Sequence, residues 1–411
     1  MRFESYRITK EIKKNLAAMG FKRPTDIQFK CIPNIQKGED VLAIAQTGTG
    51  KTAAFAIPII DQIQFNRKKD GHSGIKTIVL APTRELAVQI AEVFHQISRY
   101  TKVKTLAIHG GVEQDPQIDT LLAGVDILVS TPGRLFDLIH QGYVETDTIK
   151  TLIVDEADQM LKLGFYKDIQ DLLRHLPKNR QTLFFSATID KEIKKLAYSL
   201  VNSKAIRIQL SPKNPVSKNV THAITFVEPD HKRFVLERII KENDTLKFLI
   251  FVRTRVRAER VKAAMERVAI QSDTIHGEKE QEDRFAVLKA FKSGENRILI
   301  ATDVSARGID VPNVDYVINY DLPDKPENYV HRVGRTGRGN QKGEALSFCA
   351  EHEKPLLEGI EEYIHVPIEI IELSKSDIDQ SIFFSDDGTD NWKSLIAKNK
   401  EDFKKKRKKK K

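Results

Sequence analysis

The amino-acid sequence predicts an α/β protein of two tandem domains, each a mainly parallel sheet flanked by helices, joined by a short linker. Short apolar runs alternate with stretches of helical periodicity, which is the pattern of βαβ units. The alternation breaks once, at a polar segment that contains Pro212 and Pro215, and then starts again. The length of 411 residues allows two domains of ordinary size and short tails.

The first domain is predicted to span residues 1–208. It opens with a helix over residues 9–19, because apolar side chains recur there at helical spacing before Gly20. Residues 85–100 and 167–176 also carry helical periodicity. Six apolar runs are expected to be its strands: Val41–Ala45, Thr77–Ala81, Thr105–Ile108, Asp126–Val129, Thr151–Val154 and Thr182–Phe185.

The linker is predicted at residues 209–219 and the second domain at residues 220–373. Residues 374–411 are predicted to be a flexible tail, because Ser374–Asp390 is rich in Ser and Asp and lacks periodicity. Within it, Asn391–Phe403 has the pattern of a short helix. Five apolar runs are expected to be the strands of the second domain: Phe248–Val252, Ser272–Ile275, Arg297–Ile300, Tyr316–Tyr320 and Glu344–Cys349.

The composition argues against several classes of protein. Hydrophobic residues make up 40% and charged residues 30%, as in soluble globular proteins. No apolar run approaches the length of a membrane span, and the first residues lack an apolar signal core. Cys31 and Cys349 lie far apart, with no CxxC motif and no histidine at metal-binding spacing. We therefore expect a cytoplasmic protein with no disulfide framework, zinc site or membrane segment.

The positive charge is concentrated at one end of the chain. The formal net charge is +10, and Lys404–Lys411, which are all Lys or Arg, supply +8 of it. The rest of the chain is therefore nearly neutral. The basic run predicts sequence-independent affinity for polyanions, and the alternative is a solvated tail with no role.

A phosphate-binding motif follows the first predicted strand. Gln46-Thr47-Gly48-Thr49-Gly50-Lys51-Thr52 leads from that strand into a helix and forms a P-loop in which Ala45 replaces the usual first glycine. Backbone N–H groups of such a loop and the helix N-terminus surround phosphate. Lys51 is expected to reach the β- and γ-phosphates, and Thr52 to ligate Mg²⁺. The alternative is a glycine-rich turn without a ligand.

Three carboxylates follow the strand at Thr151–Val154. They lie in Asp155-Glu156-Ala157-Asp158. A P-loop needs a second strand that ends in an Asp to hold Mg²⁺, and Asp155 fits this role. Glu156 can orient or deprotonate the attacking water. A solvated acidic turn is the alternative, but the P-loop and the acids together favour hydrolysis of a nucleoside triphosphate.

Asp155-Glu156-Ala157-Asp158, taken with the P-loop and further segments in the expected order, resembles the DEAD-box RNA helicase family. The resemblance covers roughly residues 1–373. The layout of the chain is similar to that of the bacterial RhlE-like branch. It implies two RecA-like domains, ATP and Mg²⁺ as cofactors, and an RNA-stimulated ATPase. It further implies that domain closure separates short RNA duplexes locally and non-processively, or remodels RNA–protein complexes, in a cytoplasmic monomer.

The resemblance assigns roles to two more segments of the first domain. Gly20–Gln28 matches the Q motif, in which Gln28 would read the adenine edge and Phe21 would stack on the ring. Without the family, Phe21 reads as a core aromatic and Gln28 as a surface residue. Ser186-Ala187-Thr188 matches motif III, whose hydroxyls would bond the acid cluster at Asp158 and couple hydrolysis to RNA. A helix capping box is the alternative for these hydroxyls.

In the second domain, Tyr329–Arg338 matches motif VI. Three arginines among glycines make a poor helix and a poor strand but a good anion site. The resemblance makes Arg335 and Arg338 arginine fingers on the γ-phosphate and brings His331 to the acidic strand end. Alone, the segment could equally be a basic loop that binds nucleic acid. Ala306–Asp310 matches motif V, in which Asp310 would face the ribose.

The same resemblance predicts a track of RNA contacts. These residue types bond phosphate and sugar, so we expect little sequence specificity and a preference for RNA through its 2′-OH. Ribosome-assembly or RNA-decay proteins are candidate partners. The alternatives to a helicase are an ATP-gated RNA clamp and, more weakly, a DNA translocase. The expected RNA-binding residues are Arg84, Gly110, Gly111, Thr131, Gly133, Arg134, Arg253, Gln281, Arg284, Thr302 and Arg307.

Overall fold

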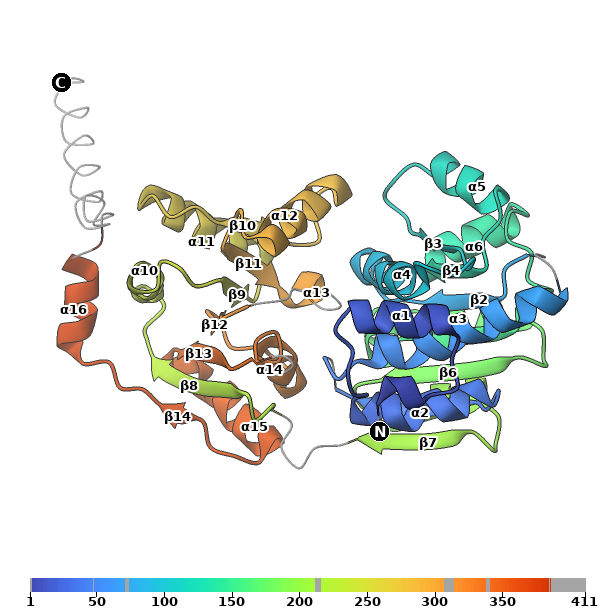
Figure 1. Cartoon of the computed structure of the whole chain (residues 1–411). Coiled ribbons are helices and arrows are strands. Elements are labelled where there is room, and N and C mark those ends of the chain that lie inside the picture. Colours follow the sequence, from blue (N-terminus) through green and yellow to red (C-terminus); the bar gives the residue numbers. More distant parts are fainter. Residues whose placement is uncertain are drawn as a thin grey trace, which may run out of the picture. The chain divides into compact units, whose positions relative to one another are not determined.

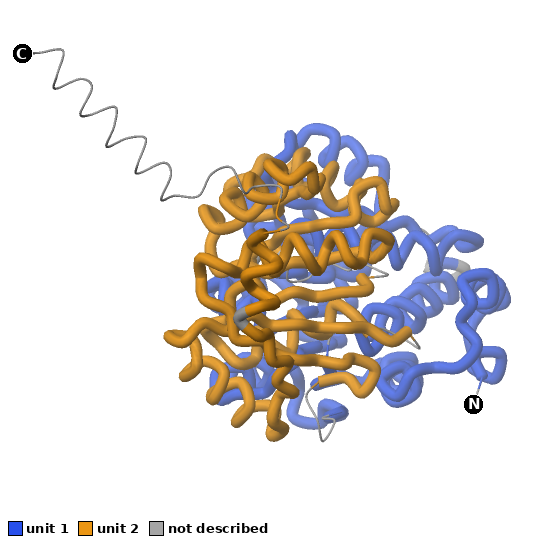
Figure 2. The backbone as a smooth tube through the Cα atoms, turned by 90° about the vertical axis from the view of Figure 1, so that its left-hand side faces the viewer, with its two compact units in different colours: residues 1–215, 308–310 blue, residues 216–307, 311–411 orange. Residues whose placement is uncertain are grey.

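The computed structural model describes residues 2–46, 48–70, 74–210, 216–306, 314–337, 341–383 and 385 (Figure 1). Contacts divide the chain into two compact units, one mainly within residues 1–215 and the other from residue 216 onward (Figure 2). In the described part of the chain, no helix combines the length and the apolar character needed to cross a membrane.

The first unit contains a seven-stranded parallel sheet in the order β3-β4-β2-β5-β6-β1-β7. All six expected runs form strands, with ends displaced by one residue at most. β7 was not expected from the sequence. Only one of its five residues is buried, so the strand lacks a continuous apolar run. The strands are β1 (Val41–Ala45), β2 (Thr77–Leu80), β3 (Thr105–Ile108), β4 (Ile127–Ser130), β5 (Thr151–Val154), β6 (Gln181–Ser186) and β7 (Ile206–Leu210).

Helices cover both faces of this sheet, so the central strands are apolar on both sides. Val41 and Ala43 of β1 face one cluster of buried side chains, and Leu42 and Ile44 face the other. The first cluster is covered by α1 (Lys10–Ala18), α2 (Asp26–Gln36), α3 (Lys51–Asp70) and α4 (Arg84–Ser98), after the short turn η1 (Phe3–Ser5). The second is covered by α5 (Asp115–Leu122), α6 (Pro132–His140), α7 (Ala157–Lys162), α8 (Tyr166–His175) and α9 (Lys191–Leu200).

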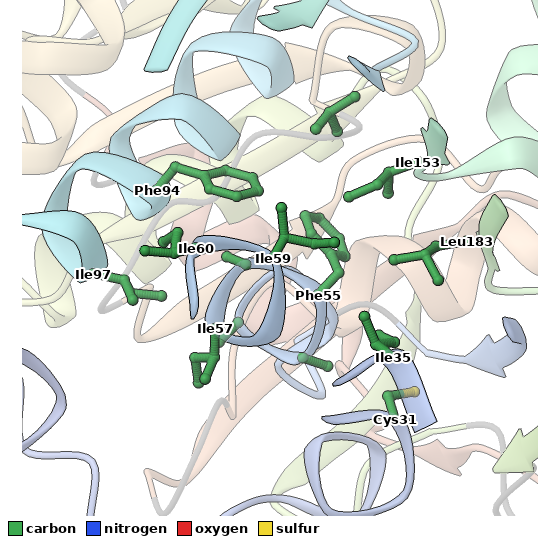
Figure 3. Close-up of a cluster of buried hydrophobic side chains, with 14 of the residues drawn as sticks. Cys31, Ile35, Phe55, Ile57, Ile59, Ile60, Phe94, Ile97, Ile153 and Leu183 are labelled. Carbon is green, nitrogen blue, oxygen red and sulfur yellow. The ribbon is translucent and has the colours of Figure 1, made fainter. Parts of the chain in front are cut away.

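Helix α3, which starts at the P-loop lysine, is central to the first cluster. Its Phe55 is fully buried and lies 5.1 Å from the Phe185 ring and 6.0 Å from the Phe94 ring, measured between centroids. Figure 3 shows Phe55 and Ile59 of α3 between α4 and the strand residues Ile153 and Leu183. The hydrophobic core therefore holds α3 in place, and the first turn of this helix is the part that is expected to contact phosphate.

The second unit repeats the topology of the first. Its parallel sheet has the order β10-β11-β9-β12-β13-β8-β14, which is the first order with every strand number advanced by seven. All five expected runs form strands. The strands are β8 (Val220–Phe226), β9 (Phe248–Val252), β10 (Asp273–Ile275), β11 (Ile298–Thr302), β12 (Tyr316–Asn319), β13 (Gly343–Cys349) and β14 (Glu369–Ile370).

Helices α10 and α11 pack on one face of the second sheet. α14 packs on the opposite face, where the Tyr329 hydroxyl lies 2.9 Å from Nδ1 of His222 in β8. The helices of this unit are α10 (Lys232–Glu242), α11 (Arg255–Arg267), α12 (Gln281–Ser293), α13 (Asp303–Ala306), α14 (Pro326–Val333), α15 (Lys354–Ile364) and α16 (Lys375–Phe383), with a short turn η2 (Glu351–Glu353).

The expectation that Tyr329–Arg338 makes a poor helix is wrong for its first half. Residues up to Val333 belong to α14, which has Pro326 at its favourable first position and buries Tyr329 and Val333. Pro326, Tyr329 and Val333 lie at helical spacing and favour this helix. The glycines of the segment begin only at Gly334, after the helix has ended.

The prediction of a flexible tail from residue 374 is wrong for Lys375–Phe383, which forms α16. Ser374 and Asp377 cap this helix reciprocally: each backbone N–H donates to the other side chain, at 2.9 Å and 3.1 Å. Arg238 of α10 also donates to the Asp377 carbonyl and to Ser381. Lys404–Lys411 lie outside the described residues, and β7 runs two residues into the predicted linker.

We predict that Phe55→Ala lowers the free energy of unfolding by about 3–5 kcal/mol, because a buried ring is replaced by a cavity. Phe65→Ala, in the same helix but at a position that is 59% exposed, should change it by less than about 0.5 kcal/mol. Guanidinium titrations followed by circular dichroism measure both values. Equal losses from the two variants would contradict the assigned core.

Candidate nucleotide and RNA site

The carboxyl ends of adjacent parallel strands bring the expected nucleotide-binding segments together. β1, β6 and β5 are neighbours in the first sheet. β1 leads into the P-loop, β6 ends at Ser186, and β5 ends one residue before Asp155. Ligands of open α/β sheets bind at this edge, so the three segments share one candidate site.

The P-loop has the backbone that its sequence predicts. Gly48 and Gly50 have φ values of +83° and +90°, a region that side-chain-bearing residues rarely adopt. The Lys51 ammonium is buried and donates to the Ala45 carbonyl at 3.0 Å, which leaves two of its three N–H groups for phosphate oxygens. The Thr49 hydroxyl donates to the Gln46 carbonyl at 2.8 Å. Thr52 lies in the first turn of α3, and Thr47 lies outside the described residues.

Asp155 is a buried carboxylate whose Oδ1 accepts a hydrogen bond from the Glu156 N–H at 2.9 Å. Burial raises the pKa of Asp155 to about 6; Lys51 opposes this shift, and the carboxylates of Glu156 and Asp158 add to it. Glu156 has left-handed backbone angles (φ 47°, ψ 50°), which is costly for a residue other than glycine.

The third acid of this cluster is tied to motif III. Asp158 Oδ1 accepts hydrogen bonds from the Ser186 hydroxyl at 3.0 Å and from the Ala187 N–H at 3.2 Å. The Thr188 N–H lies 3.4 Å from the Ser186 hydroxyl oxygen. The structure thus contains the expected hydrogen bond between a motif III hydroxyl and the acid cluster, from Ser186, whereas Thr188 contacts Ser186 through its backbone N–H.

Oxygen donors suited to Mg²⁺ are present. No group of three His, Cys, Asp or Glu side chains in the described ranges forms a metal cage. Mg²⁺ does not need one, because it keeps several waters and binds through one or two carboxylates plus substrate phosphates. The buried Asp155 carboxylate and the Thr52 hydroxyl at the start of α3 fit such a site.

Gln28 links the Q motif to the P-loop and is buried rather than on the surface. Its Oε1 accepts from the Thr25 N–H at 3.0 Å, and its Nε2 donates to the Gly50 carbonyl at 3.2 Å. A Cβ on residue 50 would lie 2.5 Å from Nε2 of Gln28, so this position also needs glycine for space. Phe21 is half-buried and packs edge-on against Phe3, with ring centroids 5.8 Å apart.

The expected RNA residues of the first unit follow the neighbouring strands β2, β4 and β3. Arg84 begins α4, and its guanidinium lies so close to Gly111 that a Cβ there would overlap it; Gly110 is adjacent. Arg134 donates to the Val112 carbonyl at 3.0 Å. Thr131 precedes α6, and Gly133 lies in its first turn.

The second unit places its candidates in the equivalent positions. Thr302 ends β11 beside Val252 in β9, so the following residue, Arg253, reaches the same edge. Gln281 is the buried first residue of α12, and Arg284 lies three residues further on, slightly less than one helical turn. Arg307 and Asp310 lie outside the described residues.

Arg335 lies just past α14, buried, with its Nε donating to the His331 carbonyl at 3.2 Å. Arg338 lies outside the described residues. Sequence reasoning did not separate these arginines from Arg332, which is only 1% exposed and binds both oxygens of Asp303, at 2.6 Å and 2.9 Å. Its spacing of three from the buried Tyr329 is the signal that could have identified it as a core residue.

The segments of this site agree with known proteins. Residues 25–196 match the DEAD/DEAH box helicase family, and residues 231–340 match the helicase conserved C-terminal domain. The ATP-dependent RNA helicase DbpA of Bacillus subtilis (strain 168) is 38% identical over 370 residues, which cover 90% of this chain and 76% of that relative. The DEAD-box ATP-dependent RNA helicase CshA of Geobacillus kaustophilus (strain HTA426) is 38% identical over 359 residues, or 87% and 76%.

The chain belongs to the DEAD-box family of ATP-dependent RNA helicases. The predicted fold is confirmed by solved structures. Dbp5 of S. cerevisiae bound to RNA and ADP BeF3 is 28% identical with a TM-score of 0.82, covering 92% of this chain and 99% of that one. Mss116 bound to ssRNA and AMP-PNP is 29% identical with a TM-score of 0.82, covering 98% and 86%. Each unit is a RecA-like domain, and the DEAD-box enzyme is an RNA-stimulated ATPase.

We predict that Asp155→Asn stabilises this helicase when nucleotide and Mg²⁺ are absent. A folded-state pKa of about 6, above the ordinary 3.8, means that the folded chain binds the proton more tightly than the unfolded chain. Wild-type stability attributable to this group is therefore full at low pH and lost as the pH rises through 6. The variant should gain up to about 3 kcal/mol at pH 7.5, and the gain should shrink towards pH 4.

Denaturant titrations across this pH range measure the difference. Asp171→Asn is the control, because the Asp171 side chain is 52% exposed on α8. A gain at Asp155 that does not depend on pH would contradict the buried-charge explanation.

Proposed function

We propose that ATP and Mg²⁺ bind where β1, β6 and β5 end. The observation that carries this proposal is the juxtaposition of the P-loop, the Ser186 hydroxyl and the buried Asp155 carboxylate along three neighbouring strands. Lys51 and Thr52 meet the phosphates and the metal, and Asp155 holds the metal. The phosphate cradle consists of Gln46, Thr47, Gly48, Thr49 and Gly50.

The Gln28 amide suits adenine. An amide has two N–H donors and two acceptor lone pairs, and one of each is used by the Gly50 carbonyl and the Thr25 N–H. The remaining donor and lone pair match the acceptor and donor that adenine presents and guanine presents in reverse. We propose that the half-buried Phe21 stacks on this base, so that the Q motif selects ATP.

Hydrolysis needs groups from both RecA-like domains in this proposal. Glu156, whose backbone is left-handed just before α7, orients or deprotonates the attacking water. Arg335 and Arg338 act as arginine fingers, with His331 at the acidic strand end. Asp310 faces the ribose. ATP then favours a closed state of the two domains by its greater affinity for that state.

RNA is proposed to run along the strand ends beside the nucleotide. The solved Dbp5 and Mss116 structures named above are RNA-bound, which supports the same ligand here. The contacts go to phosphates and sugars, so affinity is largely independent of sequence. In the first domain the track consists of Arg84, Gly110, Gly111, Thr131, Gly133 and Arg134, and in the second of Arg253, Gln281, Arg284, Thr302 and Arg307.

We propose local, non-processive unwinding. A stacked step is worth roughly 1–2 kcal/mol on the DNA duplex scale, so one closure opens a short helix only. The bond from Ser186 to Asp158, with Thr188 beside it, is the candidate coupling between hydrolysis and RNA. The proposal also includes a cytoplasmic monomer that acts with ribosome-assembly or RNA-decay proteins. It includes membership of the RhlE-like branch as well, although the relatives named above are of the DbpA and CshA types.

The competing proposal is an ATP-gated RNA clamp that holds RNA with little unwinding. The complete set of P-loop, acidic and motif VI residues favours turnover. Strand displacement from a short RNA duplex separates the two. Displacement that recurs with ATP but not with AMP-PNP supports the helicase, whereas RNA retention without displacement in either nucleotide supports the clamp.

We predict that Arg335→Ala reduces RNA-stimulated ATP hydrolysis by about 10³-fold or more, because an arginine finger stabilises charge only in the transition state. Nucleotide binding should stay within a few-fold of wild type, since the P-loop and the Q motif are intact. Steady-state phosphate release and a fluorescent-nucleotide titration measure the two quantities. Unchanged turnover would remove Arg335 from the finger role.

A further inference from the structure

Arg253 differs from the other candidate RNA residues in how its charge is held. It follows β9 at the carboxyl edge, next to Thr302, because Val252 is paired with Thr302 in the adjacent strand β11. This places its side chain in the second-domain part of the proposed RNA track. Its side chain is 36% exposed, so it is partly open to solvent.

Both N–H groups of Nη2 in the Arg253 guanidinium donate hydrogen bonds, and Nε forms an ion pair with a carboxylate. Nε pairs with Asp324 Oδ1 at 3.1 Å. Nη2 donates to Glu353 Oε1 and to the Leu322 carbonyl, both at 3.1 Å. Arginine grips phosphate most strongly through two parallel N–H groups on one edge, and the edge formed by Nε and Nη2 is occupied by two carboxylates. A phosphate that needs this edge has to replace one of them.

The two carboxylates differ in how easily they can be replaced. Glu353 is 2% exposed, and its other oxygen accepts from Lys232 Nζ at 2.6 Å, where Lys232 is 1% exposed. Moving Glu353 away would leave a buried ammonium group without its closest counter-charge, which is strongly unfavourable. Asp324 is 68% exposed, makes a surface ion pair with Arg253, and returns to water when released.

We propose that Asp324 is a displaceable competitor of RNA for Arg253 and that Glu353 is a positioning residue. An RNA phosphate takes the place of the Asp324 carboxylate on Nε, while Glu353 and Lys232 keep the guanidinium oriented. This inference rests on the proposed RNA track and adds a function for an acidic residue within it. Asp324 lowers the affinity for RNA and so favours its release.

Asp324→Asn tests the competition, because it removes one surface carboxylate at nearly constant shape. We expect tighter binding of a labelled single-stranded RNA by the full-length chain with AMP-PNP and Mg²⁺, by about two- to fivefold, the range of a surface ion pair. The dependence of log K on log salt should become steeper by up to about 0.7, since one more phosphate charge is neutralised without freeing a carboxylate. Fluorescence anisotropy at several salt concentrations measures both.

Three further variants make the test specific. Arg253→Gln should weaken RNA binding and abolish the gain from Asp324→Asn in the double variant. Glu353→Gln should shift affinity in the opposite direction to Asp324→Asn, because Arg253 loses its anchor. Asp171→Asn, which removes a carboxylate that is also exposed (52%, against 68% for Asp324) and is paired with Arg174 in the first domain, should leave RNA affinity unchanged.

An equal gain from Asp324→Asn in the Arg253→Gln background, or from Asp171→Asn, would show a general charge effect and overturn the proposal. So would unchanged RNA affinity in Arg253→Gln. If Glu353→Gln does not fold, the Asp324–Arg253 cycle decides the matter alone, because both positions are solvent-accessible. The broader helicase function is tested separately by Arg335→Ala, whose loss of turnover is independent of every outcome at Arg253.

Discussion

Parallel pairing of β1 with β6 and of β6 with β5 is the interaction on which the nucleotide site depends. Parallel strands all end at one edge, so the loops after β1, β6 and β5 become neighbours although they are far apart in the sequence. The same pairing places the ends of β2, β4 and β3 beside them. One edge of one sheet therefore offers adjoining positions for a nucleotide and for a nucleic-acid backbone, and the second sheet repeats the arrangement strand by strand.

The buried acids at the carboxyl edge of the first sheet lower the stability of the folded chain. Asp155 is buried near two further acids, and burial is the largest cause of its raised pKa. Glu156 adds backbone strain through its left-handed conformation. Neither feature improves the stability of the fold, because each could be relieved by a neutral or more flexible residue. In the proposed site, a divalent cation and phosphates would supply the missing counter-charges and contacts and make both features favourable. Folding stability would then be given up in favour of ligand binding.

Much of this could be predicted from the sequence, because buried parallel strands are continuous apolar runs and the P-loop is a contiguous motif. The predictions failed where the signal lay in tertiary packing. β7 is a half-exposed edge strand with Arg207 and Gln209 at outward positions, so it lacks an apolar run. α16 was concealed by its polar composition, although Ser374 and Asp377 form a readable capping box. For Arg332, the spacing of three from Tyr329 was the one local sign of burial, and no local signal indicated that Arg253 is partly exposed.

The contrast between Arg134 and Arg253 shows what topology alone does not determine. Arg134 follows β4 and Arg253 follows β9, which are not equivalent strands but end at the carboxyl edges of two sheets with one topology. Arg134 is anchored by the neutral carbonyl of Val112, whereas Arg253 is anchored by Glu353 and Asp324. A neutral anchor orients a guanidinium and keeps its charge for a ligand. A carboxylate anchor orients it too, but cancels its charge until the ligand displaces one partner. If both arginines bind RNA as proposed, two domains with one topology contribute differently. The first offers a standing positive charge, and the second offers a charge that becomes available only in exchange for an existing ion pair.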